Sequence, residues 1–143
     1  MSWGPTISCA ELENLVRIGT LKHEPPAEAE LAGLRQSGES RLADAQRTDL
    51  SFESRFDLTY NAAHALALYA LRRLGYRTHR RYIVFQVLPH TVGLSTGHWR
   101  VLAKAHERRN TSEYEGYLEH DERLLKDMIV STRALLDALP GDR

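Results

Sequence analysis

The chain has 143 residues, of which 42% are hydrophobic and 27% charged, with a formal net charge of zero, so it is an ordinary globular domain and not a disordered chain. No apolar run approaches the roughly 20 residues of a membrane span, and the N-terminal MSWGPTISCAELEN lacks the pattern of a signal peptide. We therefore expect one domain over residues 1–143, located in the cytoplasm, with no membrane association.

Two helices are predicted before residue 46. Ser8 and Glu11 form a capping box that opens a first helix. A proline pair at residues 25–26 starts a second helix that runs through Ala45, and Gly38 is a weak point inside it.

The third predicted helix, over residues 52–74, has the strongest pattern in the chain. Its apolar residues recur mostly at three- and four-residue spacing, and Gly75 ends the run as a C-cap. These residues are Phe52, Phe56, Tyr60, Ala63, Ala67, Ala70, Leu71 and Leu74.

A shorter helix is predicted over HRRYIVFQVL, where Tyr82, Phe85 and Leu88 share a face and Pro89 stops the helix. The β-branched and aromatic residues of YIVFQVL make a buried strand the competing interpretation. No partner strand is visible elsewhere in the sequence, which favours the helix.

The two remaining helices lie on either side of residues 110–116. Ser95 caps a fifth helix that ends at Arg109, and a sixth spans about residues 117–139 and is closed by Pro140-Gly141. The sequence therefore predicts an all-α protein, a helical bundle of five to six helices.

Charge is strongly segregated along the chain. Residues 72–109 contain nine Lys or Arg and one acid, Glu107, so this segment carries a formal charge of +8 and the rest of the chain −8. Solvated helix faces that happen to cluster would explain this pattern. A basic surface that attracts phosphate-bearing partners is the alternative, and it would include Arg80, Arg81, Lys104 and Arg108.

Several kinds of site are excluded by the sequence. A Gly-rich phosphate loop, a GxSxG elbow and an HExxH pair are all absent. The seven histidines never form a close pair at zinc-ligand spacing on one helix, and the single cysteine, Cys9, is interpreted as packing. We expect neither a metal nor a cofactor.

The segment AKAHERRNTSEYEG, residues 103–116, is the most distinctive stretch. It places Arg108, Arg109 and Asn110 together and follows them with Tyr114 and Tyr117. A solvated helix C-terminus with cations near the macrodipole and an Asn cap would explain the first three residues, but not the tyrosines.

Together with SRFDLTYNAAHALALYALRRLGY and the short basic helix after it, the segment RRNTSEYEG resembles a HEPN domain, over roughly residues 26–139. The resemblance implies a helical bundle that pairs as a homodimer. Active members form a composite, metal-independent ribonuclease site from an Arg, usually followed by a polar residue, and a His four to six residues further on. Many are toxins of toxin–antitoxin or anti-phage systems, often beside a nucleotidyltransferase partner.

Carried over to this chain, the resemblance assigns Arg109 as the motif arginine and Asn110 as the polar residue after it. Tyr114 stands where the histidine is usual. A tyrosine can donate a proton or bind a phosphate but is a poor base, since its ordinary pKa is near 10 against about 6.5 for histidine. His106, three residues before Arg109 on the same helical face, is the candidate to supply an imidazole.

Three further assignments remain alternatives. Arg100 and His106 satisfy the bare spacing of the motif, but Val101 follows Arg100, and we interpret this match as coincidence. Tyr117 is the candidate for tyrosine modification by a partner nucleotidyltransferase, which the resemblance implies for some toxins. Tyr60 and His64, one turn apart, either pack in the core or line a dimer cleft.

These features leave three hypotheses: a HEPN ribonuclease that is a toxin with a cognate antitoxin, a non-catalytic HEPN module that binds RNA or nucleotide, and a regulatory partner of another protein.

Overall fold

The computed structural model describes residues 9–141, and these residues form an all-α bundle as predicted. The elements in chain order are α1 (Ala10–Arg17), β1 (Lys22–His23), α2 (Glu28–Ala45), α3 (Phe52–Arg73), β2 (Tyr76–Arg77), α4 (Arg81–Gln86), α5 (Leu88–Thr91), α6 (Thr96–Glu115) and α7 (Glu122–Ala138). None of the helices in this range is both long and apolar enough to cross a membrane.

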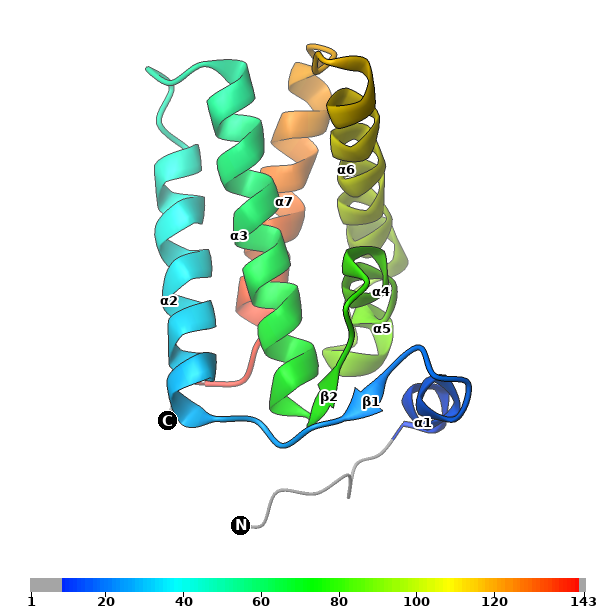
Figure 1. Ribbon diagram of the computed structural model, residues 1–143. Helices are drawn as coiled ribbons and strands as arrows, with labels where there is room; N and C mark the ends of the chain where they lie inside the picture. The colour runs from blue at the N-terminus through cyan, green and yellow to red at the C-terminus, as the bar shows by residue number, and fades with distance from the viewer. Residues whose placement is uncertain (1–8, 142–143) are drawn as a thin grey trace.

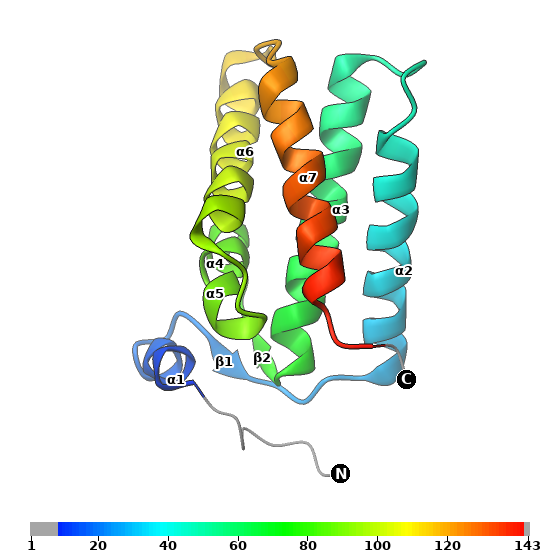
Figure 2. The same ribbon diagram turned by 180° about the vertical axis from the view of Figure 1, so that it is seen from behind.

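Four long helices build the body of the molecule. α2, α3, α6 and α7 alternate in direction along the chain, so that α2 is antiparallel to α3 and α6 to α7, whereas the neighbours α3 and α7 run parallel (Figure 1). α4 and α5 lie in the connection between α3 and α6. The reverse view shows α7 between α6 and α3, with α1 at the end of the bundle where α3 finishes (Figure 2). This is the layout of a four-helix bundle with an insertion.

α3 is the central helix because it is apolar over most of its circumference. Thirteen of its 22 residues are buried, among them the predicted face residues Phe56, Tyr60 and Leu71. Ser51 caps its start by accepting a hydrogen bond from the Ser54 backbone N–H at 3.1 Å. Gly75, at φ +91°, follows its end, so both predicted boundaries are confirmed to within one residue.

Gly38 lies where α2 packs directly against Leu66 of α3, a role that the sequence did not reveal. A Cβ atom at this position would overlap the side chain of Leu66, which is fully buried in α3. The missing side chain therefore lets the two helices pack closely, and the position is a packing device within a continuous helix.

The YIVFQVL stretch is helical, and the strand alternative is wrong. Its residues form α4 and the start of α5, with Ile83, Val84 and Phe85 buried. The prediction that Pro89 stops this helix is also wrong: α4 already ends at Gln86, and Pro89 lies in the first turn of α5, where it needs no N–H partner.

The boundary between the fifth and sixth predicted helices is wrong as well. α6 continues past Arg109 to Glu115 and ends at Gly116, whose φ is +88°. No residue between Arg109 and Gly116 breaks a helix, and the Ser112 hydroxyl donates a hydrogen bond to the Arg109 carbonyl at 2.8 Å. Asn110 is therefore not a cap but lies inside the helix.

The remaining helix starts also differ from prediction. α7 begins at Glu122, where Asp121 accepts the Leu124 backbone N–H at 2.9 Å, so Tyr117 lies in a linker and not in the helix. α2 begins at Glu28, just beyond the proline pair. The proposed cap Ser8 falls outside residues 9–141.

A fully buried arginine joins the N-terminal segment to α3. Arg72, 1% exposed, donates to both carboxylate oxygens of Glu30 at 3.0 and 3.1 Å and to the carbonyls of Glu24, Pro25 and Tyr76 at 2.8–3.1 Å. Next to it β1 pairs antiparallel with β2, a two-residue ladder that the sequence did not predict.

Candidate functional site

One face of α6 carries three of the predicted site residues, and α3 completes the group. The His106 ring accepts a hydrogen bond at Nε2 from the Asn110 side-chain amide at 3.1 Å, and its Nδ1 lies 3.0 Å from the Tyr60 hydroxyl. With Nε2 accepting, the neutral imidazole carries its proton on Nδ1 and donates it to the Tyr60 oxygen. The two hydrogen bonds thus hold the His106 ring in one orientation.

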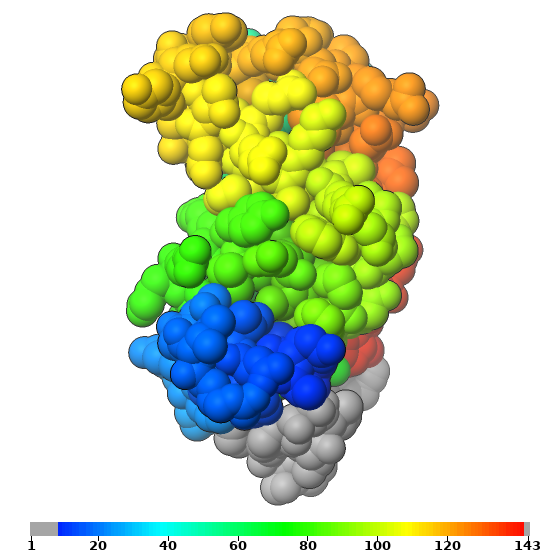
Figure 3. Space-filling model, turned by 90° about the vertical axis from the view of Figure 1, so that its right-hand side faces the viewer, coloured from blue at the N-terminus to red at the C-terminus, as the bar shows by residue number. Residues whose placement is uncertain are grey.

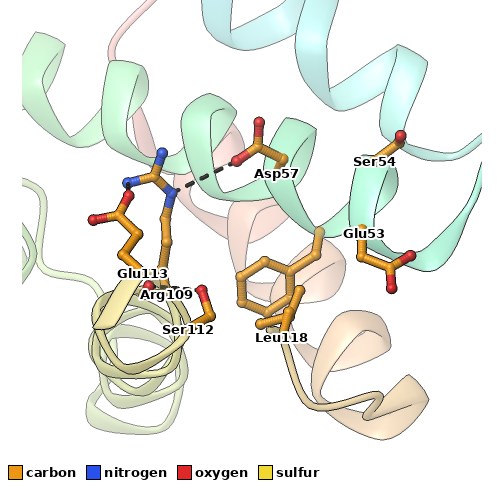
Figure 4. Close-up of a pocket in the computed structure, with 8 residues that line it drawn as sticks. Glu53, Ser54, Asp57, Arg109, Ser112, Glu113 and Leu118 are labelled. Carbon is orange, nitrogen blue, oxygen red and sulfur yellow. Dashed lines mark hydrogen bonds and ion pairs between the residues drawn. The ribbon is translucent and has the colours of Figure 1, made fainter. Parts of the chain in front are cut away.

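Arg109 lies beside this group, where it is held from three sides. Its guanidinium carbon lies 4.7 Å from the centre of the Tyr60 ring, and its nitrogens lie 3.6 Å from an Asp57 oxygen and 3.1 Å from a Glu113 oxygen. Figure 4 shows the guanidinium between these two carboxylates. Its side chain is 27% exposed, so an anion can reach it from solvent by competing with partly solvated acids.

The electrostatic environment keeps the imidazole neutral. Burial is the main cause that lowers the pKa of His106, and the positive charges of Arg81 and Arg109 lower it further, while Glu107 and Glu113 partly oppose them. A neutral imidazole beside an arginine has the composition of a proton acceptor next to a phosphate-binding group.

His64 belongs to the same neighbourhood. Its ring lies 6.5 Å from that of Tyr60 and 6.0 Å from that of Phe85, and Phe85 lies 6.1 Å from His106. Burial is the main cause that lowers the pKa of His64 to about 4, and the positive charges of Arg81 and Arg109, and of His106 when it is protonated, lower it further. Residues from α3, α4 and α6 therefore meet in one cluster.

A cavity of about 360 Å³ lies next to Arg109. Its walls are Glu53, Ser54, Phe56 and Asp57 from α3, Arg109, Ser112 and Glu113 from α6, and Leu118 from the linker (Figure 4). Three carboxylates against one guanidinium make this space unfavourable for a phosphate. The charges around His106 are of both signs, since Arg81 and Arg109 lower its pKa while Glu107 and Glu113 raise it.

The predicted tyrosines do not join the cluster. Tyr114 lies in the last turn of α6 with 93% of its surface exposed, and Tyr117 lies in the following linker, 65% exposed. Tyr114 is five residues after Arg109 on the helix, which turns it well away from the face that carries Arg109. Within one copy of the chain, the structure brings Arg109, Asn110 and His106 together and leaves Tyr114 outside.

The charge segregation in the sequence is partly cancelled in space. Arg72 and Arg77 pair with Glu24 and Glu30, and Arg108 pairs with Glu119 and Asp121 at 3.4 and 3.3 Å. Acids from outside the basic segment fold back onto it. The predicted RNA-binding residue Arg108 therefore points toward the linker and the start of α7.

Three of the predicted RNA-binding residues remain exposed and have no ion pair within residues 9–141. Arg80 and Arg81 lie at the start of α4, and Lys104 lies on α6 one turn before Arg108; all three are exposed. Figure 3 shows the surface indented between the last turns of α6 (yellow) and the α4 segment (green). The positive charge of Arg81 lowers the pKa of both His64 and His106, so of these three residues Arg81 belongs with the cluster.

Sequence reasoning missed Asp57 and placed Tyr60 and His64 without a function. The signal was present: Asp57, Tyr60 and His64 follow at three- and four-residue spacing, so they form a polar stripe on an otherwise apolar helix. The sequence did not show that this stripe faces α6, since only the packing of α3 against α4 and α6 sets that.

One group of side chains in residues 9–141 has ligand types suited to a metal. Ligand atoms of Cys9, Glu11 and His90 lie within 4.8 Å of one another, at the end of the molecule where α1 lies. The Cys9 thiol already donates to the Glu11 carboxylate at 2.9 Å, and Glu11 and His90 are exposed. We assign this group no part in the site around Arg109.

Comparison of the chain with protein-family models, with curated proteins and with solved structures gave no significant match.

Proposed function

We propose that the protein binds RNA and cleaves it without a metal, in the manner of a HEPN ribonuclease, with Arg109, Asn110 and His106 as the core of the site. One observation carries this proposal. A neutral imidazole, fixed through both nitrogens, lies on the same helical face as an arginine that solvent can reach. The resemblance of residues 26–139 to a HEPN domain gives the reaction class.

The chemistry follows from these side chains. Arg109 offers a planar fork of N–H donors that matches the oxygens of a phosphodiester. When Asn110 moves off Nε2 of His106, the lone pair there can accept the proton of a ribose 2′-hydroxyl, whose oxygen then attacks the phosphorus and expels the 5′-oxygen of the next nucleotide. That leaving oxygen needs a proton from a second group.

A homodimer is part of the proposal. The resemblance implies a composite site, and Tyr114, outside the cluster of its own chain and 93% exposed, is available to a second copy. The proposal also includes a toxin role, with a cognate antitoxin or nucleotidyltransferase as partner. Tyr117 is the residue proposed to be modified by such a nucleotidyltransferase. The exposure of both tyrosines is compatible with each of these partners.

The test is cleavage of a mixed RNA pool in the presence of EDTA, with retention of the same RNA on a filter measured in parallel. Wild type should cut and retain RNA, whereas Arg109→Ala should lose cleavage. Arg123→Ala is the matched control, because Arg123 lies on α7 with 86% of its side chain exposed. Wild type that neither cuts nor retains RNA would refute the proposal and leave a protein-interaction role.

A non-catalytic RNA-binding module is the second candidate. Both nitrogens of His106 are occupied, so no free base lies beside Arg109, which favours a site that binds RNA without cleaving it. In that case wild type retains RNA without cutting it, and Arg109→Ala only weakens retention.

A further inference from the structure

A thiol, a carboxylate and an imidazole lie together at the end of the molecule where α1 lies, and the proposed function uses none of them (Figure 1). Cys9 and Glu11 come from the start of α1, whereas His90 comes from α5, far along the chain. The Cys9 Sγ lies 2.9 Å from a Glu11 carboxylate oxygen, and the His90 Nδ1 lies 4.0 Å from the same oxygen. Three atoms that can bind a metal ion therefore surround one point between two helices.

The helices that carry these three side chains are anchored by buried neighbours. Leu12 fixes α1 in the core at 1% exposure, and Leu88 and Thr91 fix α5 at 0% and 9%. The Tyr76 hydroxyl also holds α1, because it donates a hydrogen bond to the Glu13 carboxylate at 2.5 Å. Since both helices are held in place, the three side chains can reach one ion by rotation about their own bonds.

The separations between the three ligand atoms are close to those of a zinc site. With bonds of about 2.0 Å to nitrogen or oxygen and about 2.3 Å to sulfur, the ligand atoms of a tetrahedral Zn²⁺ lie about 3.3–3.6 Å apart. The observed separations of 2.9 and 4.0 Å lie on either side of this range, and the third is no more than 4.8 Å. Glu11 and His90 are exposed, so small rotations of their side chains can correct these differences.

We propose that Cys9, Glu11 and His90 bind one Zn²⁺ ion, with a water molecule as its fourth ligand. Thiolate and imidazole are ligands that suit zinc, whereas Mg²⁺ and Ca²⁺ require oxygen ligands. On binding, the Cys9 thiol loses the proton that it donates to Glu11, and this proton passes to solvent. The ion then takes the place of the proton between the sulfur and the carboxylate oxygen.

The sequence led us to expect no metal, because none of its histidine or cysteine spacings matches a zinc motif. Only the packing of α1 beside α5 brings the three ligands together. A bound ion links the two helices, and since it binds their folded arrangement it stabilises the position of α1 on the bundle. The proposal goes beyond RNA cleavage and does not depend on it, because the proposed cleavage needs no metal and is assayed in EDTA.

The direct measurement is light absorption while the full chain is titrated with Co²⁺, a spectroscopic substitute for Zn²⁺. The protein is first freed of metals with EDTA, dialysed and kept reduced with a reagent that contains no thiol. Binding of Co²⁺ should produce a sulfur-to-cobalt charge-transfer band, which reports Cys9 because the chain has a single cysteine. Added Zn²⁺ should abolish the band by displacing Co²⁺, whereas Mg²⁺ and Ca²⁺ should leave it unchanged.

The second measurement is the Zn²⁺ affinity of variants, by calorimetry. Cys9→Ser and His90→Gln should each bind more than about a hundredfold more weakly than wild type, since loss of a residue that only hydrogen-bonds to a metal ligand already costs about ten- to a hundredfold. His120→Gln is the matched control, because His120 is an exposed histidine that pairs with a carboxylate, Glu122, at 2.8 Å but has no thiol beside it. Its affinity for Zn²⁺ should equal that of wild type.

Two results would overturn the site. One is a Co²⁺ titration of wild type without a charge-transfer band, and the other is Zn²⁺ binding by Cys9→Ser and His90→Gln that is as tight as in wild type. The second result would place the ion on other side chains of the protein. Melting curves check that the variants are folded, and the wild-type band tests the site even where a variant fails to fold.

Discussion

Arg72 and Arg109 are two arginines in aromatic and acidic surroundings, and they differ in how fully their donors are used. Arg72 is 1% exposed, and each of its nitrogens bonds to a carboxylate or a carbonyl. Arg109 is 27% exposed, stacks on Tyr60 and pairs with two carboxylates that solvent also reaches. A buried arginine whose N–H donors are all used stabilises the fold. An arginine at the surface, paired with carboxylates that solvent also reaches, can exchange these partners for a ligand.

The largest effect is expected on the Arg72 side of this comparison. Arg72→Met should lower the free energy of unfolding by about 3–5 kcal/mol, because it removes two hydrogen bonds to Glu30 and leaves three carbonyls without this donor. Urea denaturation measures this. Arg73→Met, at a residue without an ion-pair partner in residues 9–141, should cost less than about 1 kcal/mol. Equal losses in the two variants would contradict the structural role of Arg72.

At Arg109 we expect a large loss of activity and little loss of stability, the opposite of the effect at Arg72. Arg109→Lys should reduce RNA cleavage or retention by roughly ten- to a thousand-fold, since an ammonium cannot reproduce the bidentate fork or its stacking on Tyr60. Its free energy of unfolding should change by less than about 1 kcal/mol, because the pairs that it replaces are partly solvated. A Lys variant that is unstable but fully active would reverse the comparison.

The titration of His64 gives the next effect, on stability. Its pKa is about 6.5 when unfolded and about 4 when folded, so its neutral form stabilises the fold fully above pH 6.5 and that stability is lost as the pH falls toward 4. The loss from this residue should be about 1–3 kcal/mol. We expect His64→Gln to show a smaller drop in unfolding free energy between pH 7 and pH 4.5 than wild type does.

The control for that measurement is a melting curve at pH 8, which checks that His64→Gln is folded where the imidazole of wild type is neutral. An acid sensitivity identical in wild type and variant would show that His64 does not titrate in this range.

What could be predicted from the sequence followed the strength of local signals. α3 was bounded to within one residue by its long apolar repeat and Gly75. The end of α6 was missed because the polar residues 111–115 look like a turn, although none of them breaks a helix, and Gly116 is the actual stop. The pairing of β1 with β2 could not be foreseen, since a two-residue ladder has no pattern of its own.

The candidate site divides in the same way. Arg109, Asn110 and His106 are near one another in sequence and were grouped correctly, because one helix carries them. Asp57, Tyr60 and His64 come from a helix some fifty residues earlier, so only tertiary packing brings them to Arg109 and His106. Tyr114 was placed in the site by its spacing from Arg109, but the continuation of α6 carries it to another face of the helix.

A smaller effect, on RNA retention, should come from removing one of the carboxylates that pair with Arg109. Asp57→Asn removes one of its two carboxylate partners without changing side-chain size, so RNA retention should rise by about two- to fivefold, the range of a partly solvated ion pair. Binding isotherms at fixed salt measure this. Glu119→Gln is the control, because it removes an exposed carboxylate that pairs with Arg108 instead. A fall in retention would mean that Asp57 orients Arg109 for the ligand and does not compete with it.

The smallest effect is expected at Tyr114, and it separates one copy of the chain from two. Tyr114→Phe removes only a hydroxyl from a side chain that is 93% exposed, so at concentrations where the protein is a monomer the rate of RNA cleavage should change by less than about twofold. The rate is to be measured over a range of protein concentrations together with light scattering. A tenfold loss that appears only where dimers form would show that the partner's tyrosine enters the cluster around Arg109, since its own tyrosine lies on a different face of α6. In that case Arg109 would differ from Arg72 in a further respect, because the environment of Arg109 would be complete only when a second molecule binds.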